Sequence, residues 1–101
     1  MMAIQIQHIE NKIRILNEST NNPIATWTQS DVPSVYDLKS NIGNYHLAEE
    51  YGVFQLYQIT NENGGVHSVF YGKTKRELYL QITAMLEGVR IGKNCEAREV
   101  A

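Results

Sequence analysis

The sequence contains very little cysteine and proline, no excess of one charge and no long hydrophobic run. Of its 101 residues one is Cys and two are Pro, and 9 Lys and Arg stand against 11 Asp and Glu. The single thiol, Cys95, excludes a disulfide framework within the chain. No apolar run approaches the roughly 18 residues of a membrane-spanning helix, and Met1–Ile6 lacks the features of a signal peptide. We therefore expect a cytoplasmic protein with no membrane partner.

The remaining composition is that of one small domain, with 43% hydrophobic and 20% charged residues. A chain of this length can bury one modest core but not two. We expect residues 1–92 to form this domain and residues 93–101 to form a flexible C-terminal tail. Asn and Ile are abundant and Ala is sparse, a bias that AT-rich coding can produce. Such genes are frequent in phages and mobile elements.

Alternating apolar residues at the start of the sequence predict a β-hairpin. Ile4 and Ile6 would share one face with Ile13 and Ile15, and Glu10-Asn11 would form a two-residue turn between them. With this turn, both strands place their isoleucines on the same side, where they can be buried together.

The middle of the sequence is less regular. Residues 24–28 are a candidate strand, and Pro33 fits the first turn of a following helix. Val35, Leu38 and Ile42 have helical spacing in that segment, and Gly43 would end the helix. Residues 44–52 fit either a second short helix or an irregular connection.

Two further strands are predicted at 53–60 and 66–71, where β-branched and aromatic residues are concentrated. Asn63-Gly64 between them is the strongest short-range signal of a hairpin turn. A tight turn at this pair would place Tyr57 opposite Phe70 and Leu56 opposite Tyr71.

A final helix follows, because Thr74 and Glu77 have the spacing of a capping box. Its apolar residues fall within one arc at helical periodicity, and Gly92 would end it; they are Leu78, Tyr79, Ile82, Met85, Leu86 and Val89. The whole chain is thus predicted to be α+β, with an antiparallel sheet of 4–5 strands and two helices on one face. The expected order is β-β-(β)-α-β-β-α.

Residues with catalytic potential do not assemble into a known pattern. Gly72-Lys73-Thr74 resembles the end of a phosphate-binding loop, but the glycine required five residues earlier is His67. The three histidines have no metal-ligand spacing with each other or with Cys95. We therefore predict neither an enzyme nor a metal or cofactor site.

The far side of the last helix carries a second apolar strip, formed by Leu80, Ala84 and Ile91. Aligned exposed apolar residues can mark a partner surface, and Trp27 is a further interface candidate. The leading prediction is therefore a small non-enzymatic protein that acts by protein–protein interaction, such as a phage or mobile-element accessory protein or inhibitor. The strip leaves two alternatives open: a homodimer that pairs it between two copies, or a monomer in which residues 93–101 or 44–52 cover it.

The alternative is a DNA-binding regulator. Tyr57-Gln58-Ile59-Thr60, Val69-Phe70-Tyr71-Gly72 and a helix opening at Thr74 together resemble the arm-type DNA-binding domains of phage integrases. That resemblance implies that the 53–71 hairpin enters the major groove. Basic residues at the start of the last helix would add contacts to phosphates; the candidate group is Lys73, Thr74, Lys75 and Arg76. The strands depart from the family pattern because 53–71 contains no Lys or Arg.

Overall fold

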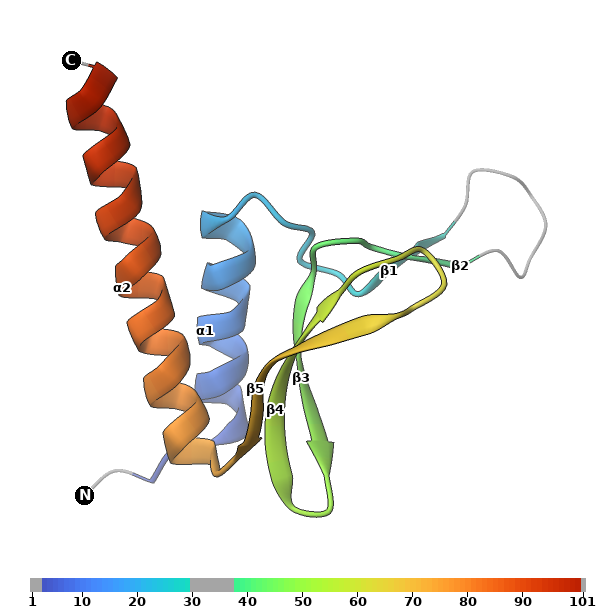
Figure 1. The fold of residues 1–101 in the computed structure, drawn as a ribbon. Helices are drawn as coiled ribbons and strands as arrows, with labels where there is room; N and C mark the ends of the chain where they lie inside the picture. Colours follow the sequence, from blue (N-terminus) through green and yellow to red (C-terminus); the bar gives the residue numbers. More distant parts are fainter. Residues whose placement is uncertain (1–2, 30–37, 101) are drawn as a thin grey trace.

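The structure is a computed structural model that describes residues 3–29 and 38–100 (Figure 1). Along the described chain, one helix precedes five strands and a second helix follows them. The elements are α1 (Ile6–Ser19), β1 (Trp27–Gln29), β2 (Leu38–Ser40), β3 (Tyr45–Glu50), β4 (Val53–Ile59), β5 (Val66–Lys73) and α2 (Lys75–Val100).

Both helices pack side by side on one face of a three-stranded antiparallel sheet with the order β3-β4-β5 (Figure 1). α1 lies against β3, and α2 lies against β4 and β5. Strands β1 and β2 form a separate two-stranded ribbon. The predicted α+β class is thus confirmed. The predicted sheet of 4–5 strands and the predicted β-β-(β)-α-β-β-α order match only in part: the five strands form two sheets, and the observed order agrees with the prediction over its last three elements.

The predicted N-terminal hairpin is wrong, because residues 6–19 form helix α1. Ile9, Ile13 and Leu16 recur at helical spacing and are buried, whereas Ile6 and Ile15 are 42% and 40% exposed. The helix ends in a Schellman motif, in which Asn21 at φ 58° takes the left-handed position. The two residues after the helix satisfy carbonyl groups of its last turn. Asn22 N–H donates to the Asn17 carbonyl at 2.8 Å, and Asn21 N–H donates to the Glu18 carbonyl at 3.3 Å.

Strands β4 and β5 occupy the two predicted segments, but their register differs from the prediction. Leu56 lies opposite Phe70 and Tyr57 lies opposite Ser68. The turn has four residues, Asn61–Gly64, because Gly64 N–H donates to the Asn61 carbonyl and Gly64 adopts φ 90°. Two register shifts along the pair then place extra residues in β5. Such bulges bend and twist a strand.

The predicted 24–28 strand is confirmed in part, as β1 begins at Trp27. β1 and β2 pair antiparallel, with Trp27 opposite Ser40. The predicted helix over 33–42 is wrong at its end, because Leu38–Ser40 is strand β2; its start, including Val35, lies outside the described residues. For residues 44–52 the sequence allows either a short helix or an irregular connection. The structure instead has strand β3 and a turn at Tyr51-Gly52 there.

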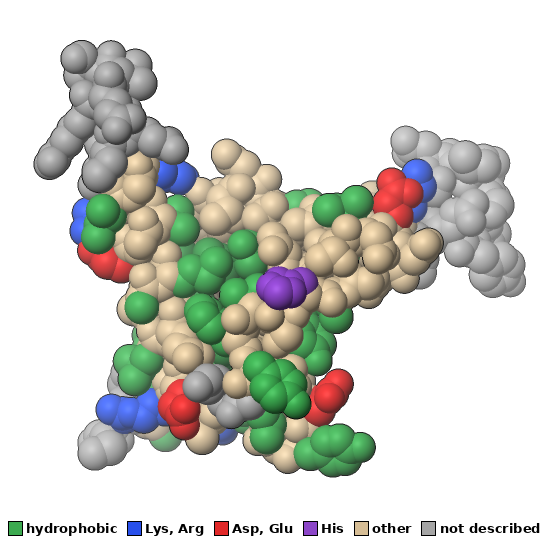
Figure 2. Space-filling model, viewed as in Figure 1, with side chains coloured by type: hydrophobic (Ala, Val, Ile, Leu, Met, Phe, Trp, Pro, Cys, Tyr) green, Lys and Arg blue, Asp and Glu red, His purple; other side chains and the backbone are tan. Residues whose placement is uncertain are grey.

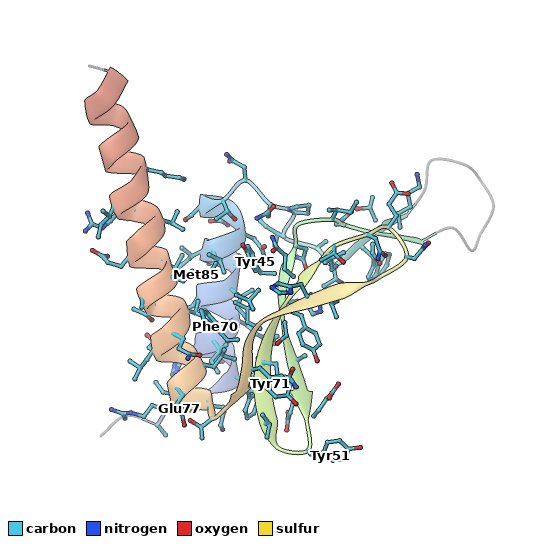
Figure 3. The ribbon with its side chains drawn as sticks, viewed as in Figure 1. Tyr45, Tyr51, Phe70, Tyr71, Glu77 and Met85 are labelled. Carbon is cyan, nitrogen blue, oxygen red and sulfur yellow. The ribbon has the colours of Figure 1, made fainter. Side chains whose placement is uncertain are left out.

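The core lies between the helices and the sheet. It is formed by the buried residues Ile9, Ile13, Leu16, Phe54, Leu56, Leu78 and Ile82. Tyr45, Phe70 and Met85 pack against this cluster, whereas Tyr51 lies away from the helices at the tip of the β3–β4 hairpin (Figure 3). The predicted capping box is confirmed, because Glu77 N–H donates to Thr74 Oγ1 at 3.2 Å. α2 continues past Gly92 to Val100, so Gly92 does not end the helix. The expected C-terminal tail, residues 93–101, therefore starts within α2.

Candidate functional site

The outer edge of the sheet at β3 has backbone groups that point away from β4. In an antiparallel pair, residues alternate between exchanging hydrogen bonds with their partner and directing them outward. Ile59 N–H donates to the Asn44 carbonyl at 2.9 Å, and the register continues without a shift from Tyr45–Gln58 to Glu50–Val53. The outward positions of β3 are therefore Tyr45, Leu47 and Glu49.

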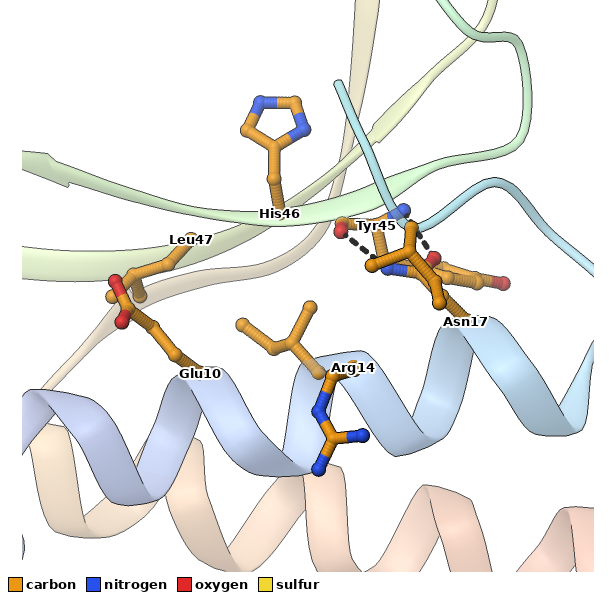
Figure 4. Close-up of a pocket in the computed structure, with 8 residues that line it drawn as sticks. Glu10, Arg14, Asn17, Tyr45, His46 and Leu47 are labelled. Atoms are coloured by element: carbon orange, nitrogen blue, oxygen red, sulfur yellow. Dashed lines mark hydrogen bonds between the residues drawn. The ribbon is translucent and has the colours of Figure 1, made fainter. Parts of the chain in front are cut away.

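A buried side chain of α1 already fills the first outward position. Asn17 is 1% exposed, and its Nδ2 donates to the Tyr45 carbonyl at 2.9 Å. The Tyr45 N–H in turn donates to Asn17 Oδ1 at 2.8 Å. Figure 4 shows both bonds as dashed lines. The primary amide therefore pairs with Tyr45 as the peptide group of a neighbouring strand would.

The next two outward positions are open. Within the described part of the chain, no protein group hydrogen-bonds to the outward N–H and C=O of Leu47 or Glu49. The other edge of the sheet, β5, is interrupted by its two register shifts, and bulges of this kind hinder the addition of a further strand. β3 is therefore the regular edge of the sheet.

A groove of about 270 Å³ lies between this edge and α1 (Figure 4). Its lining combines apolar and polar side chains; the lining residues are Glu10, Ile13, Arg14, Asn17, Ile24, Tyr45, His46 and Leu47. One wall is fixed by Asn44, whose Nδ2 donates to the carbonyls of Pro23 at 2.8 Å and Ile24 at 3.1 Å. The groove thus lies beside Leu47, the first open position of β3.

Some acidic side chains of α1 and of the β3 edge have no ion-pair partner within the described part of the chain. Arg14 is paired with Glu18 at 3.2 Å, so its charge is largely balanced within α1. Among the residues that the structure describes, Glu10, Glu49 and Glu50 have no ion-pair partner. Burial lowers the pKa of His46, which leaves the imidazole neutral at pH 7 and in edge-to-face contact with Tyr57 at 5.9 Å between ring centroids.

The structure places the sequence-predicted interface residues apart. Leu80 and Ile91 are 53% and 50% exposed on α2, and Ala84 is also exposed. Trp27 is 55% exposed, but it lies in the β1–β2 ribbon, on the other side of the sheet region from α2 (Figure 1). The strip and Trp27 therefore do not form one surface. A homodimer through the strip stays a prediction.

The predicted basic group lies at the junction of β5 and α2. Lys75 and Arg76 are exposed in the first turn of α2, and Thr74 accepts the N–H bond of the capping box. Lys73 is the last residue of β5. Its side chain is not among those that the structure describes. On the face shown in Figure 2, Lys and Arg side chains lie at the rim and form no continuous basic patch.

The described residues contain no group of three His, Cys, Asp or Glu side chains placed to hold a metal ion. No described helix has a stretch apolar enough to cross a membrane. Sequence reasoning missed Asn17, Tyr45, Leu47 and Glu49 as functional candidates. The alternation of Tyr45 and Leu47 before the Tyr51-Gly52 turn was the signal that could have indicated an edge strand.

Comparisons with protein-family models, with curated proteins and with solved structures found no match to the chain.

Proposed function

We propose that the protein is a non-enzymatic binding protein that takes an extended segment of another protein as an additional strand along β3. Addition of a strand to an exposed sheet edge is a recurring mode of peptide recognition, in which main-chain hydrogen bonds give affinity and adjacent pockets give specificity. A role as a phage or mobile-element accessory protein has only the composition in its support.

The observation that carries this proposal is the pair of open positions at Leu47 and Glu49. Their N–H and C=O groups offer four hydrogen bonds in a regular β geometry. Asn17 supports the same interpretation, because it completes the outward groups of Tyr45 and so defines where an added strand must stop. The groove beside Leu47 provides room for a side chain of the partner.

The test is a selection from a random peptide library against the immobilised protein, run in parallel against Glu49→Pro. Proline removes the outward N–H of residue 49, which takes no part in the pairing of β3 with β4, so the fold should be retained. We expect peptides enriched on the unmodified protein to bind Glu49→Pro at least about tenfold more weakly, a loss of about 1.4 kcal/mol.

Glu49→Ala is the matched control, because it removes the same side chain and keeps the N–H. It should retain more of the binding than Glu49→Pro does. Circular dichroism establishes that both variants fold. Absence of any enriched peptide, or equal binding by the folded proline variant, would contradict the proposal.

The DNA-binding alternative makes a separate prediction. If Lys73, Lys75 and Arg76 contact phosphates, their joint replacement by Gln should weaken DNA binding and reduce the salt dependence of log K by up to about three. We expect instead that the unmodified protein is not retained on duplex DNA at low salt, since its sequence pI is about 5.9. Retention that is lost in the triple variant would favour the alternative.

A further inference from the structure

We infer that the partner segment reads basic–any–apolar from its N- to its C-terminus and pairs antiparallel to β3. The inference rests on the proposed function and specifies the chemistry of the partner at the same edge. It follows from the face on which each β3 side chain lies and from the carboxylates of Glu10 and Glu49.

The apolar position follows from Leu47. Side chains alternate between the two faces of a strand, so Tyr45, Leu47 and Glu49 share the face that packs toward α1. A partner residue opposite Leu47 would direct its side chain to that same face. It would there enter the groove beside Ile13 and Leu47, which is large enough for one aliphatic side chain.

The basic position follows from Glu49. A partner residue opposite Glu49 would place its side chain on the same face as the Glu49 carboxylate, toward the Glu10 end of the groove. Neither carboxylate has an ion-pair partner in the described ranges. Lys or Arg at this position would meet two negative charges, and an antiparallel strand places it two residues before the apolar one.

The same charges disfavour a second copy of this chain as the occupant. Pairing of two β3 edges would place Glu10 and Glu49 of both copies on the same face of the joined sheet, and like charges across an interface are repulsive. Charged residues on an edge strand are also a common protection against unspecific pairing. A segment of opposite charge is attracted by these carboxylates and not repelled by them.

The experiment uses three fluorescein-labelled peptides, titrated with the full-length protein and followed by fluorescence anisotropy. They are Ser-Thr-Lys-Thr-Leu-Thr-Ser, its Lys-to-Glu counterpart, and the reversed-order peptide Ser-Thr-Leu-Thr-Lys-Thr-Ser. We expect the first peptide to bind at least about tenfold more tightly than the second. The reversed-order peptide, of identical composition, should also bind more weakly than the first.

A charge exchange provides the control within the protein. Glu49→Lys should weaken binding of the lysine peptide and strengthen binding of the glutamate peptide. Glu62→Lys makes the same change of net charge in the exposed β4–β5 turn, and it should leave the preference as it is.

The outcomes separate this inference from the proposed function. If the glutamate or the reversed peptide binds as well as the first, and Glu49→Pro abolishes binding, strand addition stands and the basic–any–apolar chemistry is wrong. If no peptide binds, the basic–any–apolar chemistry is wrong, and strand addition stands only if the library selection yields peptides that Glu49→Pro binds more weakly. If Glu49→Pro binds all of them unchanged, both are wrong. A dimer of the unmodified protein in light scattering that Glu49→Pro converts to a monomer would assign the edge to a second copy and overturn the inference.

Discussion

Replacement of Ile82 by alanine is expected to lower the free energy of unfolding by about 2–5 kcal/mol, the range of large-to-small changes in a packed core. Ile82 is fully buried and belongs to the cluster that joins both helices to the sheet. Removal of its side chain leaves a cavity that neighbours on α1 and β4 cannot fill without moving. Urea denaturation monitored by circular dichroism measures the loss.

Leu80→Ala on the same helix is the control, because Leu80 is 53% exposed. Substitutions at exposed positions usually change stability by no more than about 0.5 kcal/mol. A loss below about 1 kcal/mol for Ile82→Ala, together with a larger loss for Leu80→Ala, would mean that α2 packs through its opposite face.

The second large effect is expected at Asn17. Asn17→Ala removes both hydrogen bonds to the backbone of Tyr45. Each buried polar group left without a partner costs about 1–3 kcal/mol, so we expect a total loss of about 2–4 kcal/mol. The measurement is again the midpoint and slope of urea unfolding.

Asn11→Ala supplies the comparison, since Asn11 lies on the exposed side of the same helix. Its change should stay within about 0.5 kcal/mol. If Asn17→Ala were equally mild, water would be replacing the amide at Tyr45. The open edge would then begin at Tyr45 and not at Leu47.

The helix α1 shows why part of the fold was mispredicted. Ile4, Ile6, Ile13 and Ile15 fit a two-residue period, while Ile9, Ile13 and Leu16 fit a helical one in the same segment. The structure buries the helical set. Glu10-Asn11 lacks the glycine that usually accompanies a two-residue hairpin turn, and α2 provides a helix to pack against. Tertiary contacts of this kind are not visible in a local pattern.

The predictions for α2 were more successful because its signals agree with one another. The capping box at Thr74 and the apolar arc both indicate a helix, and Leu78 and Ile82 of that arc are buried. The end of the helix was mispredicted because Gly92 is tolerated inside it; a side chain there would meet no atom within 4 Å.

The candidate site depends on contacts between segments far apart in the chain. β3 reads Tyr-His-Leu-Ala-Glu-Glu, a sequence whose second half also suits a helix. That it forms an edge, and that Asn17 occupies its first open position, follows from the packing of α1 against β3. The exposed strip of Leu80, Ala84 and Ile91 was predicted from periodicity alone, since exposure along one helix is a local property.

The packing of the first helix against the last one also affects how the protein is made. Ile9, Ile13 and Leu16 leave the ribosome well before Leu78 and Ile82, which belong to the same core cluster. At a synthesis rate of about 5–20 residues per second, these apolar side chains of α1 stay without α2 for several seconds. The β3–β4–β5 meander has only local pairings and can form in the meantime. Final closure of the core should therefore be a late step that follows translation of α2.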